Sequence, residues 1–122
     1  MGYEVKRRNN SQGQLLEEGE YVDGVLDGYW KLWTPAGQMI SEGQFKDGKA
    51  NGLTRMWNEA SMPVCESWYE NGELHGVYRS WWENGQPKEE GMFECGQRVG
   101  KYTWYNGDGT IWQIKDFQQK GP

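Results

Sequence analysis

The chain has 122 residues, the length of one domain, and a formal net charge of −5. Only 35% of the residues are hydrophobic, which is too little for an ordinary two-layer sandwich, while an aromatic content of 15% argues against disorder. The acidic balance argues against nucleic acid or an anionic membrane as the main ligand, because both attract basic patches. The sequence has no apolar run of roughly 18 residues, so membrane insertion is not expected.

The N-terminus and the cysteines bear on the cellular compartment. The stretch MGYEVKRRNN lacks the apolar segment of a secretory signal, which predicts a cytoplasmic protein. Thiols are kept reduced in that compartment. We therefore expect Cys65 and Cys95 to be free, with a disulfide between them as the alternative.

The sequence repeats itself every 24 residues. The recurring series are Gly28, Gly52, Gly76 and Gly100; Tyr21, Phe45, Tyr69, Phe93 and Phe117; and Trp33, Trp57, Trp81 and Tyr105. A fixed period of this size is typical of repeat arrays. We divide the single predicted domain into units at about 5–28, 29–52, 53–76 and 77–100, with a shorter fifth unit at 101–122.

Each unit contains two turn signals, separated by short segments whose Trp, Tyr, Phe and Thr residues favour strands. The first set is Gln12-Gly13, Ala36-Gly37, Ala60-Ser61, Asn84-Gly85 and Asp108-Gly109, and the second is Asp23-Gly24, Asp47-Gly48, Asn71-Gly72 and Cys95-Gly96. Asn-Gly and Asp-Gly favour two-residue type I′ turns, which we expect at both positions. The sequence thus predicts an all-β fold, an elongated single-layer antiparallel β-meander of about ten short strands in tandem hairpins.

The expected turns fix which residues face each other. A two-residue loop at 36–37 gives the pairs Trp33–Ile40, Lys31–Glu42 and Trp30–Gly43, and the later units give Trp57–Val64, Arg55–Glu66, Arg79–Glu90 and Tyr78–Gly91. A loop at 47–48 gives Gly43–Gly52 and Phe45–Ala50. One face should therefore carry cross-strand pairs of opposite charge, and the other should place aromatic rings over glycines.

The strings YENGELHGVYRSWWENGQ and FKDGKANG resemble the MORN-repeat variant family. The match follows the pattern aromatic-x-N/D-G-x-x-x-G-x-W/Y, seen at Tyr69, Asn71, Gly72, Gly76 and Tyr78, and it covers 12–117. Unit 53–76 departs from the pattern, because Ser61 and Ser67 replace glycines and Pro63 lies in an expected strand. The resemblance to bacterial YwqK-type antitoxin or immunity proteins implies an array that binds and neutralises a toxin in the producing cell. It implies no catalytic residue.

The candidate chemical groups favour a protein without catalytic activity. His75 is the only histidine, and it occupies the slot of Asp27 and Asn51 in other units, which favours a loop residue over a base or ligand. The two cysteines stand in different slots with no CxxC motif, which argues against zinc. We therefore expect no catalytic residue, no metal and no cofactor, and we predict that the chain is not an enzyme.

Four tryptophans do not recur and are therefore not explained by the repeat: Trp68, Trp82, Trp104 and Trp112. The register predicts an aromatic band on one face, formed by Trp57, Trp68, Trp81, Met92, Tyr105 and Trp112, with Glu42, Glu66 and Glu90 as an acidic row on the same face. Trp, Tyr and Met are enriched in interfaces, so we assign these nine residues to partner binding. The alternatives are that the tryptophans close the end of the sheet and that the glutamates pair with Lys31, Arg55 and Arg79.

These observations lead to a functional prediction. We expect a non-catalytic protein-binding module, an immunity protein that occludes a cognate toxin, with a nuclease or deaminase as a conceivable target because its basic groove suits an acidic blocker. The alternative is a structural or membrane-proximal MORN scaffold, against which the lack of a basic amphipathic segment argues. Open edge strands make a homodimer conceivable.

Overall fold

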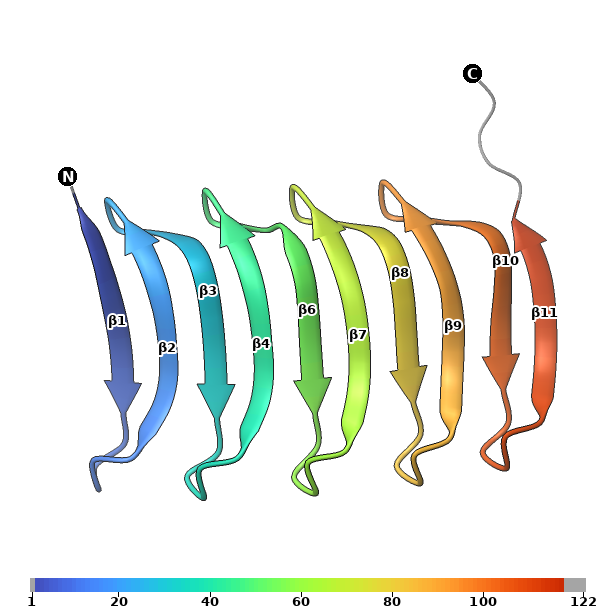
Figure 1. Cartoon of the computed structure of the whole chain (residues 1–122), viewed down its shortest axis with the longest axis horizontal. Coiled ribbons are helices and arrows are strands. Elements are labelled where there is room, and N and C mark those ends of the chain that lie inside the picture. The colour runs from blue at the N-terminus through green and yellow to red at the C-terminus, as the bar shows by residue number, and fades with distance from the viewer. Residues whose placement is uncertain (1, 118–122) are drawn as a thin grey trace.

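The computed structural model describes residues 2–117 and confirms the predicted fold, because all of its regular elements are strands of one open antiparallel sheet (Figure 1). The strands are β1 (Tyr3–Asn9), β2 (Leu15–Val22), β3 (Val25–Trp33), β4 (Met39–Lys46), β5 (Lys49–Ala50), β6 (Gly52–Trp57), β7 (Pro63–Glu70), β8 (Glu73–Trp81), β9 (Pro87–Glu94), β10 (Gln97–Tyr105) and β11 (Ile111–Phe117). Neighbours in sequence are neighbours in the sheet, with the short β5 pairing only with β4. Within residues 2–117 there is no helix that is long and apolar enough to cross a membrane.

The second turn of each unit has the predicted type I′ geometry. Both central residues adopt positive φ, as in Asp23 (50°) with Gly24 (80°) and Asn71 (51°) with Gly72 (85°). Asp and Asn tolerate this left-handed region, and glycine adopts it without steric cost. These turns all lie at the same end of the strands, along the top of the sheet in Figure 1.

The first turn of each unit is different, and the type I′ prediction is wrong there. Only its second residue has positive φ, which is 90° at Gly37 and 62° at Ser61. The Gly37 N–H donates to the Thr34 carbonyl at 2.9 Å, as in a type I turn followed by one left-handed residue. Pro35 suits such a turn because its φ is held negative. Ser61 thus performs the task of the glycine that it replaces.

The bulge beside each first turn changes the pairs next to it. Trp33 lies opposite Met39 and Trp57 opposite Pro63, which corrects the predicted partners Ile40 and Val64. The register farther from the turn is as predicted, with the pairs Lys31–Glu42, Trp30–Gly43, Arg55–Glu66, Arg79–Glu90 and Tyr78–Gly91. The extra residue is accommodated at the turn, so the inner pairs keep their places.

The second hairpin also contains an irregularity that the sequence did not predict. Phe45 faces Ala50 as expected, but Ser41 faces Met56, so the register has shifted by two residues and Gly43 does not face Gly52. Gly52 has φ 118°, which few other residues can adopt. A shift of two preserves which side chains share a face, because side chains alternate with a period of two.

One face carries a charge ladder, which we define as the row of directly opposed residues Arg7, Glu18, Lys31, Glu42, Arg55, Glu66, Arg79 and Glu90. Ion pairs join Arg7 to Glu18 at 2.6 Å, Arg55 to Glu66 at 3.3 Å and Arg79 to Glu90 at 3.4 Å. Lys31 instead holds its ammonium 5.1 Å from the centroid of the Tyr29 ring. The signs alternate from β1 to β9, so neighbouring charges in the row attract.

The opposite face, the aromatic face, contains the core. Tyr102 is fully buried there, and its ring lies 5.8 Å from Phe93 and 4.8 Å from Trp104, centroid to centroid. A Cβ atom on Gly91 would overlap the Tyr102 ring. The predicted arrangement of aromatic rings over strand glycines is therefore confirmed, and the fully buried Tyr102 lies in the C-terminal half.

Candidate binding site

Two residues of the predicted aromatic band are exposed on the charge-ladder face. Trp68 is 46% exposed and Met92 is 44% exposed, and they lie opposite Leu53 and Val77. Trp68 also supports the backbone, because a Cβ on Gly76 would lie only 3.2 Å from the Trp68 Cβ. Their assignment to partner binding stays a prediction.

Three further residues of the predicted band are half-buried at the ends of their strands, next to the first turns. Trp57 and Trp81 each lie opposite the proline that opens the next strand, Pro63 and Pro87. Burial is the main reason that the pKa of Tyr105 is raised, and the negative charge of the nearby Glu90 raises it further. These aromatic residues contribute to packing as well as to surface.

The predicted acidic row is interleaved with cations. Glu66 and Glu90 are ion-paired with Arg55 and Arg79, and Glu42 lies in register between Lys31 and Arg55. The pairing alternative therefore describes these glutamates well. A role in attracting a basic partner would have to compete with these neighbouring charges.

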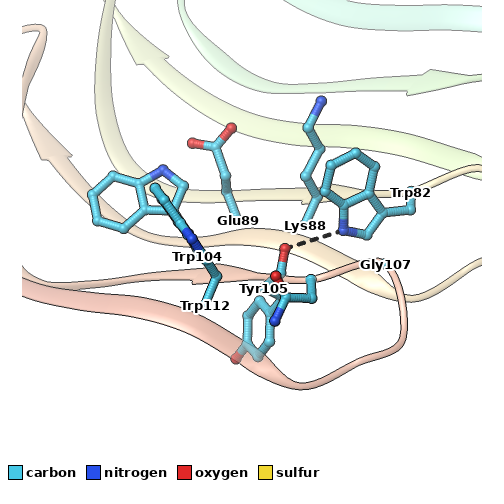
Figure 2. A pocket seen from close by; sticks show the side chains of 8 residues that line it. Trp82, Lys88, Glu89, Trp104, Tyr105, Gly107 and Trp112 are labelled. Carbon is cyan, nitrogen blue, oxygen red and sulfur yellow. Dashed lines mark hydrogen bonds between the residues drawn. The ribbon is translucent and has the colours of Figure 1, made fainter.

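Trp112 lies apart from Trp68 and Met92 of the predicted band. Trp104 pairs with Gln113 and Tyr105 with Ile111, so Trp112 is the extra residue of a β-bulge. It is 65% exposed and lines a hollow together with Trp104 and Glu89 of the aromatic face (Figure 2). The prediction that it shares a face with Trp57 and Trp81 is corrected, because the bulge breaks the alternation of side chains.

This C-terminal hollow, lined chiefly by Trp82, Lys88, Glu89, Trp104, Tyr105 and Trp112, has a volume of about 420 Å³. It lies between β9, β10 and β11 at the edge that carries the first turns. The indole N–H of Trp82 donates to the Tyr105 carbonyl at 3.3 Å (Figure 2), which ties the loop after β8 to the end of β10. The Lys88 ammonium lies 4.8 Å from the centroid of the Trp82 ring.

Glu89 forms the charged part of the hollow. Its Oε1 accepts a hydrogen bond from the Tyr102 hydroxyl at 2.9 Å and lies 3.6 Å from Arg98 Nη2. Burial, more than any other cause, raises the pKa of Tyr102 to about 12, so this hydroxyl remains a donor at neutral pH. The carboxylate is thus held in place while 20% of its side chain stays exposed.

The aromatic cluster beside the hollow already holds a cation. The Arg98 guanidinium lies 4.7 Å from the Tyr102 ring centroid, 5.5 Å from that of Phe93 and 5.6 Å from that of Trp104. Guanidinium groups stack on aromatic faces through the quadrupole of the ring. The same arrangement of rings and carboxylate is therefore chemically suited to organic cations.

Sequence reasoning found part of this hollow. Trp82 and Trp104 stood out because they do not recur, but they were not assigned to a site. Lys88 gave no signal, and Glu89, which forms a carboxylate pair with Glu90 in the sequence, was expected on the solvated surface, whereas the structure places it in the hollow. Their grouping depends on the bulge at Trp112, which is the bulge that follows each first turn and which the expected two-residue loops do not include.

His75 has a structural task. Its Nδ1 accepts a hydrogen bond from the Cys95 N–H at 3.3 Å, and Asp27 and Asn51 accept equivalent bonds from the turns of the preceding units at 3.1 Å. His75 therefore caps the next turn from within β8, which corrects the expectation of a loop residue. Among residues 2–117, no group of three or more His, Cys, Asp or Glu side chains could hold a metal ion, and both cysteines are free.

Comparison with known families agrees with this geometry. The family model described as MORN repeat variant matches residues 26–47 and 74–94, and that described as MORN repeat matches 18–29, 42–53 and 90–109. Together they cover more than half of the chain, and they leave out the irregular segment that contains Ser61, Pro63 and Ser67. A comparison with curated proteins gives no match. The chain therefore belongs to the MORN-repeat family.

Proposed function

We propose that this chain is a non-catalytic protein-binding module that acts as an immunity protein, occluding a toxin in the bacterial cytoplasm. The observation that carries the proposal is the single-layer sheet with large apolar side chains exposed on both faces, led by Trp68 at 46% and Trp112 at 65%. Exposed tryptophans of this kind are typical of binding surfaces. MORN repeats are typically protein- or membrane-binding modules, which fits this class of function.

The mechanism is steric and electrostatic. A sheet without a second layer offers a long surface that can cover a partner's active site, and its tryptophans supply the buried anchors. The net charge of −5 favours encounter with a basic partner, such as a nuclease or deaminase with a basic groove.

A protein partner is favoured over a membrane because the basic segment is largely neutralised. Lys6, Arg7 and Arg8 are consecutive in β1, but Arg7 is ion-paired with Glu18 at 2.6 Å and Arg8 with Glu17 at 3.0 Å. Anionic surfaces attract unpaired clusters of cations. Sedimentation with anionic and neutral vesicles is therefore expected to leave the protein in solution, and co-sedimentation would favour the scaffold alternative.

The decisive experiment is co-expression with the product of the neighbouring gene. A stable complex and rescue of growth from that product would support the immunity function, and absence of both would reject it. Trp68→Ala serves as a probe of the charge-ladder face, with circular dichroism to verify that the sheet is retained. If that face binds the toxin, the variant should bind at least about fivefold more weakly.

A further inference from the structure

We propose that the C-terminal hollow receives an arginine side chain of the protein partner, stacked on Trp104 and Trp112 and paired with Glu89. This inference rests on the proposed binding function and names the chemistry of one contact. The repeat pattern does not account for Trp82, Trp104 or Trp112, and the hollow that they line is on the aromatic face, away from Trp68.

The chain itself shows how a guanidinium fits beside these rings. Arg98 lies over Tyr102 and Trp104 and approaches Glu89 Oε1 at 3.6 Å. The Tyr102 hydroxyl also bonds to Oε1. Both contacts are thus made by one carboxylate oxygen, and Figure 2 shows the carboxylate between Trp104 and Lys88. A second guanidinium in the hollow would meet Oε2 and the indole faces.

The size and lining of the hollow suit a planar cation. Its volume of about 420 Å³ lies in the range of small-ligand pockets, which begins at roughly 300 Å³. Arginine is favoured over lysine because the guanidinium is planar, weakly hydrated and able to stack while it pairs with a carboxylate.

A sugar fits less well, because two of the polar groups around the hollow already have partners within the chain. The Trp82 indole N–H donates to the Tyr105 carbonyl, and the Asn106 amide donates to Thr110 Oγ1 at 2.9 Å. Sugar hydroxyls need several such groups free, whereas a stacked guanidinium needs indole faces and one carboxylate.

Lys88 provides a test of charge. Its ammonium lies over Trp82, across the hollow from Trp104 and Trp112 (Figure 2). It repels any cation that enters the hollow. Lys88→Gln should therefore strengthen binding of a cation and leave binding of a neutral side chain unchanged, whereas Glu89→Gln should weaken binding of a cation while keeping an acceptor for the Tyr102 hydroxyl.

The probe is N-acetyl-arginine methylamide, with N-acetyl-citrulline methylamide as the neutral isostere. Indole N–H signals of the ¹⁵N-labelled full chain report on each tryptophan by nuclear magnetic resonance. The arginine compound should shift the Trp104 and Trp112 signals at millimolar concentration and bind about two- to fivefold more tightly than citrulline, with an effect that weakens as salt is added. Equal binding of the two compounds, or stronger binding of N-acetyl-tyrosine amide, would overturn the proposal.

The variants complete the test. Trp112→Ala and Glu89→Gln should each reduce the response to the arginine compound at least about twofold, and Trp68→Ala should not change it. In a complex with the toxin, Trp112→Ala and Glu89→Gln should weaken binding. If the complex forms and neither variant weakens it, the arginine contact is rejected and the immunity function stands. If the arginine compound binds but no complex forms, the immunity function is rejected and the chemistry of the hollow stands.

Discussion

Glu17 and Glu89 occupy the same position of the repeat, three units apart, yet their surroundings differ. Glu17 accepts hydrogen bonds from the Trp30 indole at 2.7 Å and from Arg8 at 3.0 Å. Glu89 accepts from the buried Tyr102, and beside it Trp104 stands where the N-terminal end has Leu32. The same repeat position therefore links neighbouring strands by hydrogen bonds at the N-terminal end, through Glu17, and lines a hollow at the C-terminal end, through Glu89.

The difference is one of packing as well as charge. At the N-terminal end the edge strand β1 supplies the cation that pairs with Glu17. At the C-terminal end the edge strand β11 supplies the bulged Trp112 instead. A repeat array can therefore keep its backbone while its ends acquire separate tasks, because each unit contacts mainly its neighbours.

The largest expected effect on stability comes from substituting the strand glycines that pack against side chains of the aromatic face. A Cβ on Gly91 would overlap the buried Tyr102 ring, whereas one on the equivalent Gly19 would lie 3.0 Å from the flexible end of Leu26. Gly91→Ala should lower the free energy of unfolding by about 3 kcal/mol and Gly19→Ala by less than about 1 kcal/mol, measured by urea denaturation. Equal losses would show that the two ends are packed alike.

The C-terminal end should weaken in alkali. The pKa of Tyr102 is raised from 10.0 to about 12, chiefly by burial, so its contribution to stability is complete below pH 10 and is lost as the pH rises towards 12. The urea midpoint of the wild type should fall over this range more than that of Tyr102→Phe. Burial also raises the pKa of Tyr78, which is present in both proteins, so most of its contribution is common to the two profiles. Parallel pH profiles would contradict the burial of the Tyr102 hydroxyl.

The N-terminal end should weaken in acid. The Trp30 hydrogen bond, with that of Arg8, lowers the pKa of Glu17 below its ordinary value of 4.5. Its contribution is therefore present above that pH and is lost as the pH falls through the lowered pKa. Glu17→Gln should show a smaller loss of urea midpoint between pH 5 and pH 2 than the wild type. If the urea midpoint of Glu17→Gln falls with pH as much as that of the wild type, the hydrogen bonds of the Glu17 carboxylate add no stability.

The smallest effect concerns the charge ladder, where Arg7–Glu18 and Arg79–Glu90 are equivalent pairs at 2.6 and 3.4 Å. Glu18 also accepts from the Tyr29 hydroxyl, and its side chain is 16% exposed, against 52% for Glu90. Arg7→Ala should therefore destabilise more than Arg79→Ala, with both below about 1 kcal/mol. A larger loss of stability in Arg79→Ala than in Arg7→Ala, measured by urea denaturation, would show that the distance and burial of an ion pair do not determine its contribution to stability.

The sequence predicted the parts of the fold that follow from local chemistry. Asp47-Gly48 forms its type I′ turn because both residues accept positive φ, and the inner pair Lys31–Glu42 follows from counting back from a turn. The first turns were misjudged, because a single left-handed glycine such as Gly37 also terminates a type I turn. The hollow was missed for the same reason, because the bulge that accompanies each of these turns places Trp112 beside Trp104, and the expected two-residue loops contain no bulge.

The central claim is that the C-terminal end, and not the N-terminal end, provides a site for a cation. The most direct test measures the shift of the indole N–H signals on titration with N-acetyl-arginine methylamide in Glu89→Gln and in the matched variant Glu17→Gln. We predict weaker binding in Glu89→Gln and wild-type binding in Glu17→Gln. Equal weakening in both variants, or none in either, would contradict the assignment of the hollow as the binding site.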